Sequence, residues 1–231
     1  MSKKFAIIGL GHFGGFLANF LEEKGAEVLA IDSDMNKLED VKEMVTRAVR
    51  LDSTDEKALR TQDLSEYDAV IVGMGDDFEA SILTVSILQI IGVKRIIVRA
   101  TTEITKRILS NLGIKEIILP TEEAAMRVAN TLMMDKVINS VLLESDYSIV
   151  EMITPIEFTG KTLQQLDLPK NYKVNIVTIK RKVTQSKLLG FGEETFEQIV
   201  GIPNGETKIE KDDVLLVFGE EKSIRKLLKK A

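Results

Sequence analysis

The sequence has no cysteine, no tryptophan and a single histidine among 231 residues, and its formal net charge is −5. The absence of cysteine excludes disulfides and thiolate metal sites and is typical of a cytoplasmic protein. The negative charge provides no basic field for nucleic acid or anionic lipid, so we expect no nucleic acid among the partners. Hydrophobic content of 44% and charged content of 29% are ordinary for a globular chain of one or two domains.

Long apolar runs and a leader segment are lacking too. The longest apolar stretch, residues 80–93, contains Gln89 and Gly92 and is shorter than the roughly 20 residues that a membrane-spanning helix needs. Lys3 and Lys4 lead directly into a strand pattern, so no signal peptide is expected. These features predict a cytoplasmic chain that does not itself cross a membrane.

What the sequence does contain is a glycine motif near its amino terminus. The apolar residues 5–8 lead into Gly-x-Gly-x-x-Gly at residues 9–14, and residues 16–21 are apolar at helical spacing. Strand, glycine turn and helix in this order are typical of a dinucleotide-binding βαβ unit. Gly9 permits the sharp turn, Gly11 lets the backbone approach a diphosphate, and Gly14 lets helix and strand pack closely. The helix then offers free N–H groups to an anion.

A carboxylate follows at the spacing that this motif requires. The second expected strand, residues 27–32, ends in Asp32, about twenty residues beyond the glycines. An acid there accepts hydrogen bonds from ribose hydroxyl groups and repels a 2′-phosphate, so the sequence disfavours NADP. The alternative is a buried glycine turn that holds no ligand. Strand, turn, helix and acid in register favour a nucleotide site.

Six strand-and-helix units over residues 5–134 predict an α/β fold with a Rossmann-like, doubly wound parallel sheet. Right-handed crossovers place the loops that follow the strands at one edge of the sheet. The glycine loop, Asp32, Asp52, residues 73–75 and Arg99 are therefore expected to meet in one crevice, where one ligand can touch all of them.

The remainder of the chain has a different pattern, with alternating β-branched runs at residues 174–181 and 214–219. We expect a first domain at residues 1–135, a linker or crossover at 136–150 and a small α+β domain at 151–231. The helix expected from Thr121 to about Met134 carries an apolar outer face made of Ala125, Val128, Ala129, Leu132 and Met133. This face either packs on its own sheet or forms the seam of a two-fold dimer.

Catalytic groups are scarce, and we expect no enzyme and no metal site. A nicotinamide dehydrogenase needs a proton donor or acceptor, and the only histidine, His12, lies inside the glycine loop. The Tyr-x-x-x-Lys, Gly-x-Ser-x-Gly and P-loop patterns are all absent. A small NAD-dependent oxidoreductase remains the alternative if the second domain delivers a catalytic residue over the crevice.

The whole chain resembles the cytosolic RCK regulatory subunits of Trk- and Ktr-type potassium uptake systems, which join a TrkA-N domain to a TrkA-C domain. In the first domain, the residues that carry the resemblance are 9–14, 31–34, 51–54, 73–77, 98–100, Pro120, Ala124 and Ala125. In the second domain they are residues 160–163, 166–168, 176–181 and 213–219. The glycine loop alone is unspecific, whereas both domains in this order are specific.

The resemblance implies a homodimer that assembles into an octameric ring on a potassium-translocating membrane subunit, peripheral to the inner face of the cell membrane. Such rings bind ADP, ATP or NAD(H) in the crevice, and the ligand changes the ring and thereby gates ion flux. Motifs and resemblance together nominate as cofactor-binding residues Gly9, Gly11, His12, Phe13, Gly14, Asp32, Ser33, Asp34, Asp52, Ser53, Gly73, Met74, Gly75 and Arg99.

Two positions depart from the family pattern. His12 stands where Ktr-type members often carry an arginine that reaches the terminal phosphate of ATP. Thr121 stands where many carry a glutamate that helps to hold a divalent cation at the dimer seam, with Glu122 displaced by one residue. The nucleotide preference and any cation site therefore stay open.

The second domain is too small to cover its own apolar face, so we expect it to pair with its copy in another subunit. In relatives this domain binds cyclic di-AMP. The resemblance therefore suggests Ile176, Ile179 and Pro203 as a platform for the bases and Lys180 or Arg181 as phosphate ligands. The alternative is a plain dimer core with both basic side chains solvated.

Overall fold

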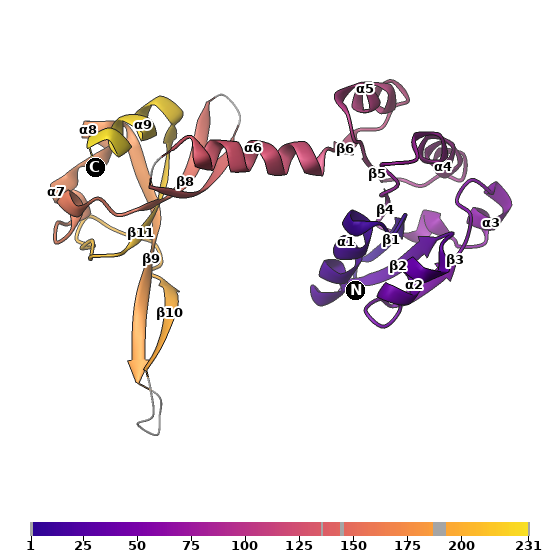
Figure 1. The fold of residues 1–231 in the computed structure, drawn as a ribbon, viewed down its shortest axis with the longest axis horizontal. Coiled ribbons are helices and arrows are strands. Elements are labelled where there is room, and N and C mark those ends of the chain that lie inside the picture. The colour runs from indigo at the N-terminus through magenta and orange to yellow at the C-terminus, as the bar shows by residue number, and fades with distance from the viewer. Residues whose placement is uncertain (1, 135, 144–145, 187–192, 231) are drawn as a thin grey trace. The chain divides into compact units, whose positions relative to one another are not determined.

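The structure is a computed structural model that describes residues 2–134, 136–143, 146–186 and 193–230 (Figure 1). The chain divides into two compact units, Met1–Thr121 and Glu122–Ala231. Among the described residues, no helix combines the length and the apolarity that crossing a membrane requires.

The first unit is built on a six-stranded parallel sheet with the order β3-β2-β1-β4-β5-β6. Its strands are β1 (Lys4–Ile8), β2 (Glu27–Asp32), β3 (Arg47–Arg50), β4 (Ala69–Val72), β5 (Ile96–Arg99) and β6 (Glu116–Ile118). The strand order reverses between β1 and β4, and ligands of open α/β sheets bind at the carboxyl ends of the strands beside such a reversal. The glycine loop follows β1, at this point.

Helices alternate with these strands along the chain (Figure 1). They are α1 (His12–Glu23), α2 (Met35–Val41), α3 (Glu56–Arg60), the short 3₁₀ helix η1 (Leu64–Glu66), α4 (Phe78–Ile90) and α5 (Glu103–Asn111). Successive residues of β1 enter different cores: Ile7 belongs to the same hydrophobic cluster as Ala18 of α1, and Ile8 to the same cluster as Val85 of α4. This alternation buries both faces of the sheet and confirms the predicted doubly wound fold.

The second unit contains a five-stranded antiparallel sheet with the order β10-β9-β11-β8-β7. Its strands are β7 (Val137–Leu142), β8 (Tyr147–Ile153), β9 (Val174–Ser186), β10 (Glu193–Ile199) and β11 (Val214–Glu220). The helices are η2 (Ile156–Phe158), α7 (Leu163–Leu166), α8 (Leu168–Tyr172) and α9 (Glu221–Lys230). Ile224 and Leu227 of α9 are fully buried in the core of this unit. The predicted small α+β domain is thereby confirmed.

The division of the chain differs from the one expected from the sequence. Residues 136–150, expected as a linker or crossover, include all of β7 and part of β8, and β8 pairs with both β7 and β11. The physical reason is that β11 lies far along the sequence, so the extended run at residues 137–153 does not reveal its partner. Helix α6 (Pro120–Leu132) spans the division between the two units and contains no buried residue (Figure 1).

Candidate nucleotide-binding site

The glycine loop has the close contacts that only glycine allows. Gly9 has a φ of +92°, and a Cβ atom there would lie 2.4 Å from Cγ of Met74. A Cβ on Gly14 would lie 2.0 Å from the carbonyl oxygen of Gly9, so α1 approaches β1 as closely as the backbone permits. A Cβ on Gly11 would meet no heavy atom within 4 Å. Gly9 and Gly14 therefore shape the loop, whereas Gly11 faces open space where a ligand can approach.

The amino end of α1 presents backbone donors beside this space. Gly11 is the N-cap of α1 and makes no side-chain capping hydrogen bond. His12 is exposed, Phe13 is half-buried, and both lie in the first turn of the helix. Unpaired N–H groups and the helix dipole at such an end favour an anion.

Asp32, at the end of β2, is buried, with 7% of its surface exposed. Its Oδ2 atom accepts a hydrogen bond from the amide of Leu10 at 2.7 Å, and its Oδ1 atom accepts one from the amide of Asp34 at 2.9 Å. Nζ of Lys37 lies 3.6 Å from Oδ2. The acid therefore fixes the glycine loop to the end of β2 as well as facing the crevice.

A cavity of about 280 Å³ opens at this edge of the sheet. Its lining residues come from the ends of β1, β2, β3 and β4 and from the start of α4: Ile8, Gly9, Asp32, Ser33, Leu51, Asp52, Ser53, Thr54, Met74, Asp77 and Ala80. Six of the nominated residues lie in this lining, namely Gly9, Asp32, Ser33, Asp52, Ser53 and Met74. Residues from four separate loops thus meet around one space.

Asp52 is an exposed carboxylate of this lining. Its Oδ1 atom accepts hydrogen bonds from the hydroxyl group of Thr54 at 2.7 Å and from the amide of Thr54 at 2.9 Å. These two bonds, the hydroxyl one foremost, lower the pKa of the Asp52 carboxyl below its ordinary value. Asp52 is therefore an acceptor that stays charged at neutral pH.

Ser53 lines the cavity and also makes contacts within the protein. The side chain of Ser53 is buried. Its Oγ atom accepts a hydrogen bond from Oγ1 of Thr84 at 2.8 Å and donates one toward Sδ of Met74 at 3.6 Å. The hydroxyl group thus joins α4 to the loops after β3 and β4 and supports the cavity from behind.

Arg99, at the end of β5, lies along the loop that follows β4. Its Nη1 atom is 3.5 Å from the carbonyl oxygen of Gly73, and a Cβ on Gly75 would lie 3.0 Å from Cζ of Arg99. Gly73 is equally crowded, since its Cβ would lie 2.9 Å from the carbonyl oxygen of Gly9. The glycines let Arg99 lie against this loop, beside the glycine loop and outside the lining of the cavity.

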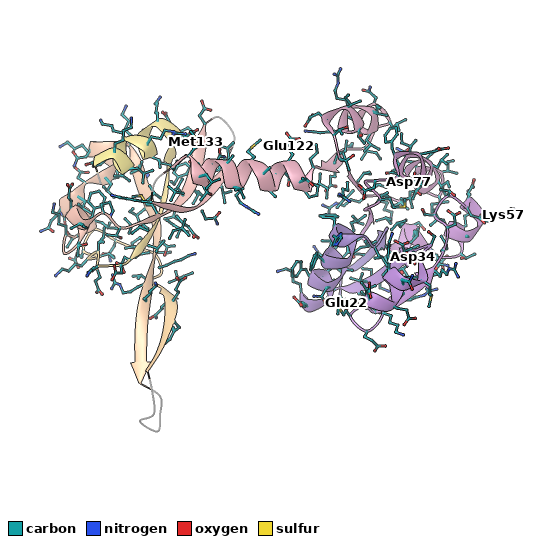
Figure 2. All side chains as sticks on the ribbon, viewed as in Figure 1. Glu22, Asp34, Lys57, Asp77, Glu122 and Met133 are labelled. Atoms are coloured by element: carbon teal, nitrogen blue, oxygen red, sulfur yellow. The ribbon has the colours of Figure 1, made fainter. Side chains whose placement is uncertain are left out.

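Two aspartates serve helix ends. Asp34 accepts the amide of Asn36 at 2.9 Å and begins α2, whereas Asp77 accepts the amide of Ala80 at 2.9 Å and begins α4 (Figure 2). Asp34, which was nominated as a ligand contact, caps α2 and lies outside the lining of the cavity, whereas Asp77, which was not nominated, lies in that lining. Thr54 was also missed; a hydroxyl residue two positions after a strand-terminal acid is the signal that could have found it.

The platform suggested for the second domain is contradicted in part. Ile179 is fully buried in the core, so it cannot lie beneath a base. Arg181 donates to both carboxylate oxygens of the buried Asp213, at 2.9 and 2.8 Å, and to Glu210 at 2.7 Å. Nζ of Lys180 lies 2.6 Å from Oε1 of Glu151. Both basic side chains have carboxylate partners within the unit, and neither is solvated alone.

The same unit has a cavity of about 500 Å³. Its lining includes two of the suggested residues, Ile176 and Pro203, together with Asn175 and Asn204. Groups of three or more metal-ligating side chains are absent from the described parts of both units.

Comparison with known proteins places the two units in a family. Residues 5–120 match the TrkA-N domain, and residues 155–231 match the TrkA-C domain. The chain is 35% identical over 230 residues to Ktr system potassium uptake protein C of Bacillus subtilis (strain 168), across 100% of this chain and 98% of that protein. It is 30% identical over 227 residues to Ktr system potassium uptake protein A of Vibrio alginolyticus, across 98% and 97% of the two chains.

Solved structures share the fold at lower identity. The GsuK RCK domain superposes with a TM-score of 0.62 and 17% identity, over 99% of this chain and 47% of that one. The GsuK channel bound to NAD gives a TM-score of 0.62 and 17% identity, over 99% and 39% of the chains. Because both domains match in order and these two relatives align over 98% and 97% of their own length, the chain belongs to the RCK family, among the proteins of Ktr and Trk potassium uptake systems that join a TrkA-N to a TrkA-C domain.

Proposed function

We propose that the chain is a nucleotide-sensing regulatory subunit of a potassium transporter. The observation that carries the proposal is the cavity of about 280 Å³, where the glycine loop, two strand-terminal carboxylates and the loop after β4 meet. It lies beside the point of strand reversal, where open α/β sheets bind their ligands. The potassium transporter is inferred from the family, because the similar proteins belong to Ktr potassium uptake systems.

The ligand that suits this lining is an adenine nucleotide: ADP, ATP, NAD or NADH. The exposed carboxylate of Asp52 and the remaining lone pairs of Asp32 accept hydrogen bonds from ribose hydroxyl groups and from the base. The phosphates lie at Gly11, where the backbone is open, and at the amino end of α1. His12 and Arg99 flank this end and contact the phosphates.

The site binds and does not catalyse. The described lining residues of the cavity carry carboxylate, hydroxyl, thioether and aliphatic groups, without the His, Lys or Tyr that carbonyl reduction uses as a proton donor. This chemistry supports a sensor over the small oxidoreductase. A regulatory role also requires a partner, and we propose a potassium-translocating membrane subunit, contacted by homodimers assembled into a ring.

Calorimetry of the full chain with ADP, ATP, NAD⁺ and NADH tests the site. We expect binding of at least one of them, weakened in Asp52→Asn and unchanged in Asp40→Asn, an exposed position of α2. Potassium flux through a reconstituted Ktr membrane subunit, measured with and without the bound nucleotide, tests the regulation. Absence of binding by all four nucleotides would overturn the proposal, and turnover of NADH with small carbonyl compounds would favour the oxidoreductase.

A further inference from the structure

Two cationic side chains lie at the ribose end of the proposed nucleotide site. Arg50 is the register partner of Asp32 at the carboxyl ends of the neighbouring strands β3 and β2. Its Nε atom donates to the carbonyl oxygen of Ser33 at 3.0 Å, and Ser33 lines the cavity. Lys37, in the first turn of α2, lies 3.6 Å from the Asp32 carboxylate.

The carboxylate of Asp32 is already paired with groups of the protein itself. Both carboxylate oxygens accept backbone N–H groups, and Lys37 forms an ion pair with Oδ2. With 7% of its surface exposed, Asp32 presents little unpaired negative charge to a ligand. The repulsion that an acid at this position exerts on a 2′-phosphate, the basis for disfavouring NADP, is therefore largely offset.

The guanidinium group of Arg50 is available on the same side. The side chain is exposed, and its Nη1 and Nη2 atoms have no hydrogen-bond or ion-pair partner among the residues that the structure describes. The contact from Nε to Ser33 holds the group beside the cavity and leaves the other nitrogens for a ligand. A guanidinium group matches a phosphate with two parallel hydrogen bonds.

We propose that this end of the site accepts a phosphate on the 2′-oxygen of the adenosine ribose, with Arg50 as its ligand, so that NADP(H) belongs to the ligands of the chain. The inference rests on the proposed nucleotide site and specifies which dinucleotides that site accepts. Two further acids, Asp52 and Asp77, line the same cavity. Because these acids prevent a net positive field, the phosphate is held by its hydrogen bonds to the guanidinium group of Arg50.

Calorimetry of the full chain with NAD⁺ and NADP⁺, in wild type and in Arg50→Gln, tests this selectivity. We expect wild type to bind NADP⁺ at least as tightly as NAD⁺. Arg50→Gln should weaken NADP⁺ binding by about tenfold or more, because both charged hydrogen bonds of the guanidinium group are lost, and leave NAD⁺ binding nearly unchanged. The matched control is Arg60→Gln, an exposed arginine of α3 paired with Glu56, which should change neither affinity.

Each other result counts against the inference. NAD⁺ binding with rejection of NADP⁺ overturns it and leaves the proposed nucleotide site standing. Equal losses for both ligands in Arg50→Gln would show that Arg50 supports the loop through Ser33 and does not read the 2′-phosphate. If no adenine nucleotide binds, the proposed function fails and the inference fails with it.

Discussion

The Oδ2 atom of Asp32 lies 2.7 Å from the amide nitrogen of Leu10 and accepts its hydrogen bond. The end of β2 is thereby joined to the glycine loop that follows β1. Because Oδ1 accepts the amide of Asp34, the same carboxylate also fixes the entry to α2. One buried acid therefore shapes two of the loops that surround the candidate site.

Asp32→Asn should weaken both the first unit and its ligand binding. An amide supplies one acceptor oxygen in place of two, so one of the two backbone N–H groups loses its partner, at a cost of about 1–3 kcal/mol in unfolding free energy. Urea unfolding and nucleotide calorimetry measure the two effects. Asp40→Asn, on the exposed side of α2, should change neither. Wild-type stability in Asp32→Asn would mean that the two amides do not depend on the carboxylate.

A feature can be predicted from the sequence when the residues that form it lie close together along the chain. The glycine loop and the position of Asp32 are visible because strand, turn and acid lie within one stretch of chain. The partners of Asp32 are not visible: Leu10 is 22 residues away, and Lys37 is placed by the start of α2. The hydroxyl of Ser53 points to Thr84, 31 residues away, and this inward direction has no local signal.

Pairing between distant strands is the other limit. Strands β7 and β8 are recognisable as extended, but their place in the second sheet depends on β11. The register of β9 against β11 shifts between Leu216 and Val217, an irregularity that puts both Ile176 and Ile179 on the core side. A strict two-residue period cannot reveal such a shift, so the suggested base platform was wrong for Ile179.

Gly11→Ala and Gly14→Ala should separate binding from folding. Gly11 has a φ of −63°, which any residue adopts, and an added Cβ meets nothing within 4 Å. We therefore expect Gly11→Ala to keep wild-type stability and to lose nucleotide affinity, because the methyl group occupies the space in which a phosphate approaches. Gly14→Ala should destabilise the first unit, because its Cβ would lie 2.0 Å from the carbonyl oxygen of Gly9.

Thermal unfolding and calorimetry on the same samples measure both effects of the glycine substitutions. Undiminished nucleotide affinity in Gly11→Ala would show that the phosphate lies elsewhere. A Gly14→Ala protein as stable as wild type would show that α1 can shift away from β1 without cost.

Thr54→Val should raise the pKa of the Asp52 carboxyl toward its ordinary value, since the hydroxyl hydrogen bond is the main cause of the lowering. A lowered carboxyl pKa stabilises the folded state above the ordinary pKa, and this contribution is lost as the pH falls through the lowered value. The variant should therefore lose stability at neutral pH and lose less in acid. An NMR titration of Asp52 measures the shift directly.

Thr61→Val is the control for this titration, because the Thr61 hydroxyl donates to a backbone carbonyl and not to a carboxylate. It should leave the pKa of Asp52 where it is in wild type. An unchanged Asp52 titration in Thr54→Val would assign the lowering to the Thr54 amide alone.

Arg181→Met should destabilise the second unit by about 3–5 kcal/mol, the cost of leaving a buried charge without its partner. Asp213 is fully buried and forms an ion pair with Arg181. The guanidinium group of Arg181 also donates to the carbonyl oxygen of Lys208. Scanning calorimetry of the full chain reports the transition of this unit. Lys182→Met, the exposed neighbour on β9, should leave that transition in place. If the second unit unfolds in the same transition in both variants, water takes the place of the arginine as the partner of Asp213.

The exposed face of α6 bears on the proposed dimer. Leu132 and Val128 of α6 are 79% and 54% exposed, Met133, directly after the helix, is 70% exposed, and no residue of the helix is buried. Figure 2 labels Glu122, in the first turn of α6, and Met133, directly after its last residue. Apolar area removed from water stabilises an interface by about 25 cal/mol per Å², so this face favours self-association.

Leu132→Asp should therefore shift the chain from dimer toward monomer in sedimentation experiments. In a two-fold interface each substitution occurs twice, and both copies then bury a charge in an apolar contact. Arg127→Asp introduces the same residue at another exposed position of α6 and should leave the dimer intact if the apolar face alone forms the seam. Nucleotide binding should survive in both variants, because α6 contributes no residue to the cavity. A Leu132→Asp protein that stays dimeric at micromolar concentration would remove this face from the interface.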